Sequence, residues 1–376
     1  MRKKQNLVSV LLSIYNVDDY LEECLDSILG QSYKNLEVVC VNNGSPDRCG
    51  EILKKYAKKD ERIKIVTLKE NKMLCGGRNA GLDNATGDYV CFVDPDDWIE
   101  KDYIKSMVEA IEKQKDPDGN LYNLVINYAA KNFSSIDGHV IEQYDYATGN
   151  YSVEEGNKNP LFEANIPAWG RLYRKKFLDD VKEHFTEGFQ TDNIPYMYKL
   201  LANLKYEYVI SRNTHKNSEY WRRIVLTKET LTSKVVYKGF ELPILFMELV
   251  NYLKEKDALH KVKIPFHLFF NISFPVHNDK TRCYLKYKEL MLLIENEIKG
   301  NKLYDEQDIY LCDALLYSSS FFEFCRYYFP DRQVAKKQNV YVKFLGIIPF
   351  LKIKNNRFYL FYFIPLFTYK FKDKRI

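Results

Sequence analysis

A chain of 376 residues can form two or three packing units of roughly 100 to 200 residues each. Its 28% charged and 46% hydrophobic residues are ordinary for a globular protein and exclude a largely disordered chain. The net charge of +5 is unevenly distributed, because residues 334–376 hold ten Lys or Arg and one acid, a charge of +9, which leaves −4 for the rest. A mildly acidic body therefore carries a strongly basic tail.

The cysteines and the N-terminal residues indicate a compartment. The eight cysteines form no CxxC pair and several lie in apolar runs, which favours a reducing cytosol. The chain starts basic and then apolar, but Ser9, Ser13 and Asn16 interrupt the apolar run and no small-residue cleavage site follows, so we interpret it as a strand and not as a signal peptide. No apolar stretch reaches the roughly 18 residues that span a bilayer. We expect a cytoplasmic protein, soluble or peripheral at the inner face of the membrane.

The first hundred residues alternate two hydrophobic periods, one typical of buried strands and one typical of amphipathic helices. Strands that alternate with helices form a mostly parallel sheet with helices on both faces, so the predicted fold class is α/β. Such sheets bind ligands at the carboxyl ends of their strands. Strands are predicted at 8–14, 36–41, 63–68 and 89–93, and helices at 17–29, 51–57, 79–85 and 101–113.

Beyond about residue 120 the strand signals weaken, and from 237 to about 328 the pattern becomes helical. Apolar-periodic runs there predict helices at 242–253, 287–298 and 309–324. The sequence therefore predicts four parts, which are two halves of an α/β domain, a helical C-terminal region and a basic aromatic tail, at residues 1–115, 116–235, 236–332 and 333–376.

The tail contains an internal repeat, in which residues 344–356 are echoed by residues 360–372. Each copy is an apolar-aromatic run around a proline, followed by lysines. The pattern fits strands that pack on the body, and it also fits a membrane-surface anchor, because aromatic rings and lysines suit the interface with anionic lipid. A nucleic-acid arm is the third interpretation, but the tail is too apolar for a simple phosphate-binding strip, so no nucleic-acid partner is expected.

Three carboxylates stand together in Asp94-Pro95-Asp96-Asp97, directly after the predicted strand 89–93. They repel one another unless a cation lies among them. A hard divalent ion, Mg or Mn, held by one or two carboxylates and by phosphate oxygens would balance them, as in sites that handle nucleotide diphosphates. The alternative is a helix N-terminus, with Asp94 or Asp96 as the cap of a helix that begins near Trp98.

Two further polar segments are predicted at the same edge of the sheet. Residues 42–47, Asn-Asn-Gly-Ser-Pro-Asp, suit contacts to a nucleobase or ribose, and they suit a tight turn before a helix equally well. In Gly76-Gly77-Arg78 the glycines allow close backbone approach to a ligand, and the guanidinium can balance diphosphate charge. There is no P-loop, no GxGxxG after the first strand and no histidine pair at helical spacing, so ATP hydrolysis, nicotinamide binding and a zinc site lose support.

Taken together and in order, these segments resemble the inverting family 2 glycosyltransferases, which have the GT-A fold. The close resemblance covers about 100 residues, and the Asp-Pro-Asp-Asp segment looks like the DXD motif of the family. A weaker resemblance continues in Trp-Gly-Arg-Leu-Tyr-Arg, in Phe-Thr-Glu-Gly-Phe-Gln-Thr-Asp and in Tyr-Trp-Arg-Arg. The closely matching segments are 8–16, 21–33, 42–47, 76–81 and 94–97, and the weaker ones are 168–178, 185–192 and 220–232.

The resemblance implies a Rossmann-like GT-A domain that moves a sugar from a nucleotide-diphosphate donor to a hydroxyl of a saccharide or lipid-linked saccharide acceptor. It implies Mg or Mn as cofactor and a role in the synthesis of bacterial surface polysaccharide, such as lipopolysaccharide. By the same resemblance, Asp192 is the general base and Glu187 its substitute. The implied metal ligands are Asp94 and Asp96, the acceptor-binding residues are Trp169 and Trp221, and the donor-binding residues are Ser13, Tyr15, Asn43, Ser45, Arg78, Asp94 and Asp97.

Several alternatives stay open beside these roles. A helix cap would explain Asp192, and core packing would explain the two tryptophans. The family usually has an aspartate where this chain has Asn43, although an amide can both accept from and donate to a uracil edge. This departure motivates a competing class, a binding module on the same fold that has lost turnover, and a nucleotidyltransferase is a third and weaker reading. Thr191 replaces the usual Glu before the base, which alters its surroundings and does not remove it.

Overall fold

The computed structural model describes residues 5–127, 130–134, 140–144, 149–152, 167–187, 193–210, 217–224, 241–260, 262, 264, 266, 270, 280–301, 304, 306–328, 351–354, 357–360 and 365–368. The chain divides into two compact units, Met1–Leu226 and Thr227–Ile376. The first unit contains the α/β region that the sequence predicts. The second unit contains the C-terminal helices and the basic tail that the sequence predicts.

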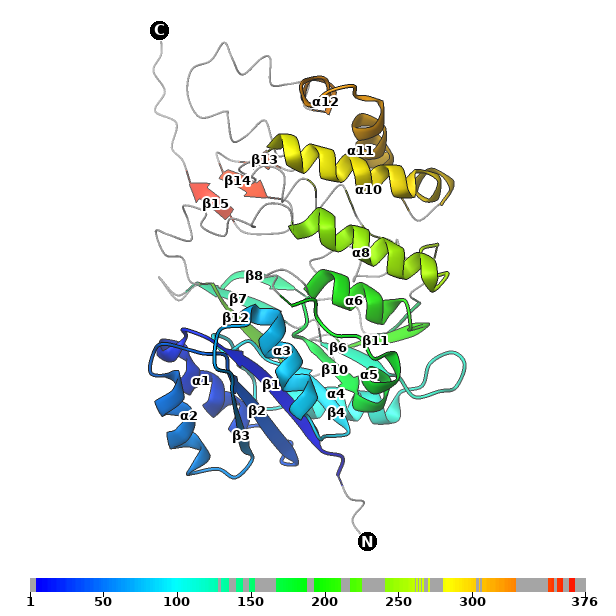
Figure 1. Ribbon diagram of the computed structural model, residues 1–376. Helices are drawn as coiled ribbons and strands as arrows, with labels where there is room; N and C mark the ends of the chain where they lie inside the picture. The colour runs from blue at the N-terminus through cyan, green and yellow to red at the C-terminus, as the bar shows by residue number, and fades with distance from the viewer. Residues whose placement is uncertain are drawn as a thin grey trace. The chain divides into compact units, whose positions relative to one another are not determined.

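An eight-stranded sheet forms the centre of the first unit, with the order β3-β2-β1-β4-β10-β6-β11-β9 (Figure 1). β1 to β4 are mutually parallel neighbours, β10 is antiparallel to both β4 and β6, and β9 is antiparallel to β11. The predicted mostly parallel α/β sheet is therefore confirmed. Its strands are β1 Val8–Ile14, β2 Leu36–Asn42, β3 Ile63–Thr67, β4 Tyr89–Phe92, β6 Leu124–Asn127, β9 Gly149–Ser152, β10 Arg171–Arg174 and β11 Tyr206–Ile210.

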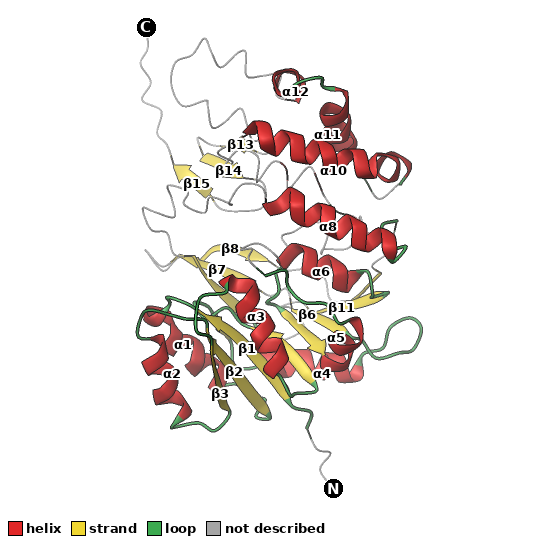
Figure 2. Ribbon diagram, viewed as in Figure 1, coloured by secondary structure: helices red, strands yellow, loops and turns green. Residues whose placement is uncertain are grey.

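Helices and a smaller sheet surround this centre (Figure 2). The helices of the first unit are α1 Asp18–Leu29, α2 Cys49–Ala57, α3 Met73–Asn84, α4 Tyr103–Lys113, α5 Lys175–Val181 and α6 Asn193–Leu201. The smaller sheet has the order β5-β12-β7-β8, with β5 Trp98–Ile99, β7 Ala130–Ser134, β8 Val140–Tyr144 and β12 Tyr220–Ile224. It joins the residues that directly follow the acidic segment to a strand more than a hundred residues later in the chain.

The strands β1, β2 and β4 are buried on both faces of the large sheet, because successive side chains point to opposite sides and both sides are covered. On one face Val10 and Leu12 of β1 share a core with Leu25 of α1 and Met107 of α4. On the other face α3 approaches β1 closely, as Figure 1 shows with α3 in front of the strands. A Cβ built on Gly81 would lie 3.4 Å from the Leu11 Cβ, so a small residue at this position allows the approach.

The helix α3 begins six residues earlier than the predicted helix 79–85. The predicted helix began too late because glycine disfavours helices and two glycines, Gly76 and Gly77, stand in a row. Packing overrides this preference, since both glycines are buried and a Cβ on Gly77 would collide with the Ser13 side chain. Arg78 therefore projects from the middle of a helix and not from a loop.

The second unit contains the helices α8 Glu241–Glu255, α10 Lys280–Gly300, α11 Glu306–Tyr317 and α12 Phe321–Tyr328. The single helix predicted at 309–324 was wrong, because three serines separate α11 from α12. Ser319 donates its backbone N–H to Glu323 Oε2 at 2.6 Å, and Ser320 Oγ accepts the Glu323 N–H at 3.2 Å. Serine hydroxyls accept hydrogen bonds from the backbone N–H groups that have no partner at the start of a helix. A new helix therefore begins after this serine segment.

The tail forms a three-stranded antiparallel sheet of β13 Leu351–Lys354, β14 Arg357–Leu360 and β15 Pro365–Thr368. β15 begins at a proline, a position that tolerates the missing N–H. The predicted strands are therefore present, whereas packing on the body and membrane binding both stay predictions. Among the helices in the described part of the chain, none combines the length and apolar character needed to cross a membrane.

Candidate functional site

Four loops leave the sheet at one edge. The register pairs Ile14 with Asn42, Asn42 with Thr67 and Leu11 with Phe92, so the carboxyl ends of β1 to β4 lie side by side. The polar segments that the sequence predicts for this edge follow β1, β2 and β4, and α3 starts a few residues after β3. This is the edge at which open α/β sheets bind their ligands.

The acidic segment after β4 is a tight turn. The Asp97 N–H donates to the Asp94 carbonyl at 3.0 Å, with Pro95 at the second position, where its fixed φ suits the turn. The next residues form the strand β5, and the following helix α4 begins only at Tyr103. The alternative in which Asp94 or Asp96 caps a helix is therefore wrong.

A buried arginine pairs with the first carboxylate of the turn. Arg78 Nη2 of α3 lies 2.7 Å from Asp94 Oδ1, and the side chains are 3% and 27% exposed. The guanidinium also lies 5.9 Å from the ring centre of Phe92 and 5.6 Å from that of Phe185. Because a low local dielectric strengthens the attraction between opposite charges, Arg78 fixes the direction of Asp94 and places positive charge beside the turn.

Tyr220 of β12 also holds the turn. Its hydroxyl donates to Asp97 Oδ2 at 2.9 Å and accepts the Asp94 N–H at 3.0 Å. Burial raises the pKa of the phenol well above its usual range, so the group stays protonated and keeps donating. The Trp169 ring stacks on Tyr220, with centroids 4.7 Å apart and planes at 13°. Trp169 thus packs against the core and lies one ring away from the acidic turn.

A second stack lies on the pairing of β5 with β12. Trp98 and Trp221 are register partners, their rings are 5.4 Å apart and nearly parallel, and both are half-buried. Trp221 Nε1 donates to Glu100 Oε1 at 3.1 Å. Gln31 anchors this region to α1, since its amide donates to the Glu100 carbonyl at 2.7 Å and accepts the Ile104 N–H at 3.1 Å.

The turn after β2 is held by its own side chains. Asn42 Oδ1 accepts the Ser45 N–H at 3.0 Å, and Ser45 Oγ accepts the Asn16 N–H at 2.7 Å, which ties this turn to the end of β1. Burial alone would raise the pKa of Asp47, but hydrogen bonds from Ser45 and Cys49 hold it at about 2. The tight turn before a helix is therefore present, because α2 starts two residues later.

Asn43 is 1% exposed and contacts the loop before α3. Its Nδ2 donates to the Met73 carbonyl at 2.7 Å and to Asn71 Oδ1 at 3.3 Å, and its Oδ1 accepts the Lys72 N–H at 2.9 Å. Both ends of the amide thus hold the 71–73 segment against the carboxyl end of β2. Of the other predicted donor residues, Ser13 is half-buried against Gly77, and Tyr15 is 42% exposed at the same edge.

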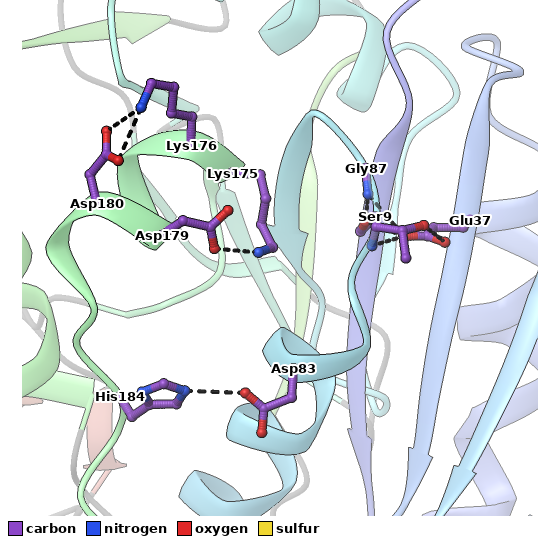
Figure 3. A network of polar contacts seen from close by, with 10 residues as sticks. Ser9, Glu37, Asp83, Gly87, Lys175, Lys176, Asp179, Asp180 and His184 are labelled. Atoms are coloured by element: carbon purple, nitrogen blue, oxygen red, sulfur yellow. Dashed lines mark hydrogen bonds and ion pairs between the residues drawn. The ribbon is translucent and has the colours of Figure 1, made fainter.

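The predicted base, Asp192, lies outside the described residues and directly precedes α6. Earlier in the chain, two described residues contact α3. Phe185 donates its N–H to Asn79 Oδ1 and accepts from Asn79 Nδ2, both at 2.9 Å. One residue earlier, His184 faces Asp83 at 3.2 Å (Figure 3). The substitute base Glu187 lies at the surface, 52% exposed and 3.9 Å from Lys72.

The sequence pattern alone did not indicate roles for four residues of this region, Asn79, Trp98, Phe185 and Tyr220. Each lies inside one of the segments that resemble the family or directly beside one, so position along the chain was available as a signal. What the sequence pattern lacked was the pairing of β5 with β12 and the packing of residue 185 on α3, which only the tertiary structure brings about.

The acidic turn fits a hard divalent cation. Asp94 and Asp96 offer carboxylate oxygens and are half-exposed, and the pairing of Asp94 with Arg78 uses only part of the capacity of a carboxylate. Mg²⁺ is commonly held by one or two carboxylates together with phosphate oxygens. Within the described ranges, no group of three or more His, Cys, Asp or Glu side chains could hold a metal ion without such help.

Comparison with known proteins finds solved structures and curated sequences that are similar to this chain. Staphylococcus aureus TarS 1–349, solved in complex with UDP-GlcNAc, has a TM-score of 0.69 with 16% identity, over 95% of this chain and 96% of that one. Glycosyltransferase GlyA of Streptococcus pneumoniae is 39% identical over 178 residues, which are 46% of this chain and 25% of GlyA. Glycosyltransferase GlyG of the same organism is 28% identical over 280 residues, 66% of this chain and 87% of GlyG.

The first unit therefore has the GT-A fold. The model of glycosyl transferase family 2 matches residues 9–181, so this part of the chain is similar to that family. The expected resemblance is confirmed for the N-terminal half, where β1 to β4 and the acidic turn lie. The chain spans only a quarter of the length of GlyA.

Proposed function

We propose that the protein transfers a sugar from a nucleotide-diphosphate donor to a hydroxyl of a saccharide acceptor, with inversion, in the synthesis of cell-surface glycan. The observation that carries the proposal is the acidic turn at the carboxyl end of β4, which is held by the ion pair of Arg78 with Asp94 and by the hydrogen bond of Tyr220 to Asp97. A charged turn held this firmly suits a ligand that brings both negative phosphates and a cation.

On the donor side, the edge of the sheet provides the contacts. Arg78 would offset diphosphate charge, and Ser13, Tyr15 and Ser45 line the ends of β1 and β2 where the nucleoside would bind. Asn43 supports this part by holding the 71–73 segment in place. UDP-GlcNAc is the first donor to test, because TarS, which shares the fold, was solved with it.

Asp94 and Asp96 would hold Mg²⁺ or Mn²⁺. When bound, the cation acts as a Lewis acid that stabilises the negative charge of the departing diphosphate. The acceptor hydroxyl must lose its proton as it attacks, and Asp192 is the proposed base. Trp169 and Trp221 would hold the acceptor ring in line with the donor carbon. Asp97, bonded to Tyr220, keeps the turn in shape.

The test has a binding arm and a turnover arm. Thermal unfolding against a panel of nucleotide sugars, with and without Mn²⁺, should show a rise in Tm for the donor in the presence of the cation. Release of nucleoside diphosphate from that donor should then fall at least about 100-fold in Asp96→Asn. Asp257→Asn is the matched control, because that carboxylate is 98% exposed and belongs to the other unit.

The outcomes separate the two classes that the sequence left open. Binding that depends on Mn²⁺ without any release of nucleotide would favour the binding module. If no nucleotide sugar raises Tm and none is cleaved, both the enzyme and the binding module fail.

For cellular location, we propose a cytoplasmic enzyme whose basic aromatic tail holds it at the inner membrane face, where lipid-linked acceptors are presented.

A further inference from the structure

Asn79 is a buried amide with no assigned role. It follows Arg78 directly on α3 and is 6% exposed. Its side chain pairs with both backbone groups of Phe185, accepting the N–H and donating to the carbonyl, each at 2.9 Å. The Asn79 amide therefore satisfies both backbone groups of Phe185, as a neighbouring strand would in a sheet. Without these two hydrogen bonds, the buried backbone groups of Phe185 would destabilise the fold.

Phe185 also contacts α6. Its ring stacks on Tyr196 with centroids 3.9 Å apart and planes at 25°, and it meets Phe92 edge-on at 5.7 Å. Phe185 and Tyr196 are 2% and 1% exposed. Tyr196 lies in the first turn of α6, and Asp192 is the residue directly before that helix. The two ends of the segment that contains Asp192 are thus fixed against each other.

An ion pair also joins α6 to the residues just before Phe185. Lys199 of α6 lies 3.5 Å from Glu183, and the lysine side chain is only 9% exposed. The ion pairs of Lys72 with Glu187 and of His184 with Asp83 are about half exposed, and exposed pairs contribute little. The two hydrogen bonds of Asn79 therefore form a buried contact between α3 and this region, beside the Arg78 guanidinium that faces the Phe185 ring.

We propose that Asn79 is a positioning residue for Asp192, acting through Phe185 and Tyr196; the proposal rests on the proposed function, in which Asp192 is the base. Neighbouring residues on a helix point in different directions. Adjacent residues of α3 then serve both halves of the site, because Arg78 pairs with Asp94 and Asn79 binds the backbone of Phe185, whose ring stacks on the first turn of α6.

The first test is hydrogen exchange on the full chain, which needs no ligand. In Asn79→Ala the amides of residues 183–187 should lose protection. In Asn84→Ala, the same change on the same helix, they should not, because Asn84 is exposed and bonds only to Ala80 of its own helix at 2.8 Å. Unchanged protection in Asn79→Ala would overturn the proposal.

The second test is kinetic, with the donor that the nucleotide-sugar panel selects and with Mn²⁺. Asn79→Ala should lower kcat about 10- to 100-fold and leave the donor KM within about 2-fold, because a displaced base slows proton transfer and not binding. Phe185→Leu, which keeps both backbone bonds and removes the ring stack, should reproduce the loss. Asn84→Ala should retain the wild-type kcat.

A double-mutant cycle distinguishes positioning from general support. If Asn79 acts through Asp192, then Asn79→Ala should cost less than about 2-fold in an Asp192→Asn background. A full further loss in that background overturns the positioning role and leaves the proposed function intact. An Asp192→Asn chain as active as the wild type would instead remove Asp192 as the base, and with it both the proposed mechanism and this role.

Discussion

A carboxylate with five hydrogen bonds lies at the edge of the sheet away from the acidic turn. Glu37 at the start of β2 is 4% exposed and accepts from Ser9, Lys64, and the backbone and side chain of Thr86. The Gly87 N–H adds a bond at 3.1 Å, and Figure 3 shows Ser9, Glu37 and Gly87 together. This cluster joins β1, β2 and the turn before β4, so it fixes the strands whose far ends carry the site.

Glu37 should make stability depend on pH. Burial alone would raise its pKa, but the bonds from Lys64, Ser9 and Thr86 lower it to about 2. A carboxylate with a lowered pKa stabilises the fold fully above its ordinary value near 4.5, and the contribution is lost as pH falls from there toward 2. We expect about 2 to 3 kcal/mol of such stabilisation. Denaturant unfolding between pH 7 and pH 3 measures it.

The matched variant is Glu37→Gln, which keeps the shape and removes the charge. It should be less stable than the wild type at pH 7, and the difference should shrink as the pH falls toward 3. A constant difference across that range would contradict the assignment of a lowered pKa.

Gly77 should resist even the smallest side chain. A Cβ there would collide with Ser13 and lie 3.1 Å from Asn43 Nδ2, so Gly77→Ala must push α3 away from β1. Overpacking of this kind costs about 1 to 3 kcal/mol, and the shift should also weaken donor binding. Urea unfolding and donor-induced Tm shifts measure the two effects. Gly300→Ala is the control, because open space surrounds that position at the end of α10.

At the scale of elements, the short pairing of β5 with β12 determines the shape of the acidic turn. β5 has only two residues, yet it carries Trp98 onto Trp221 and aligns Tyr220 with Ile99. The hydroxyl of Tyr220 then closes the turn through Asp97 and Asp94. A strand from late in the domain therefore completes a loop from its first hundred residues.

Removal of one hydroxyl tests this closure. Tyr220→Phe keeps the stack with Trp169 and leaves buried Asp97 without that donor, which costs about 1.5 to 3 kcal/mol. Because the turn would loosen, kcat should fall about 10-fold or more in the nucleotide-release assay. Tyr317→Phe, at a residue that is 72% exposed on α11, should change neither stability nor kcat. Equal effects of the two changes would show that the hydroxyl does not shape the turn.

At the scale of the whole molecule, charge separates the body from the tail. Residues 334–376 hold +9 against −4 for the rest, and the basic residues accompany apolar and aromatic ones. Basic groups near anionic lipid contribute about 1 kcal/mol each. Deletion of 334–376 should therefore abolish sedimentation with vesicles that contain phosphatidylglycerol and leave nucleotide release unchanged. A truncated chain that still pellets with such vesicles would exclude the tail as the anchor.

Local pattern alone determined much of this protein. The strands β1 to β4, the helices between them and the order of the polar segments could be predicted, because buried strands and amphipathic helices are encoded at short range. The start of α3 and the break between α11 and α12 were missed. The start of α3 was missed because close packing against β1 favours Gly77 despite the low helix propensity of glycine. The break was missed because serine side chains begin a new helix inside an apolar run.

Tertiary structure decided which side chains meet. The sequence indicated that Arg78 and the three aspartates belong to one edge of the sheet, but it did not indicate that Tyr220 bonds Asp97 or that Asn79 holds Phe185, more than a hundred residues away. Such contacts follow from strand pairing and helix packing between distant segments. Their energy depends on burial and distance, and no local pattern in the chain encodes either.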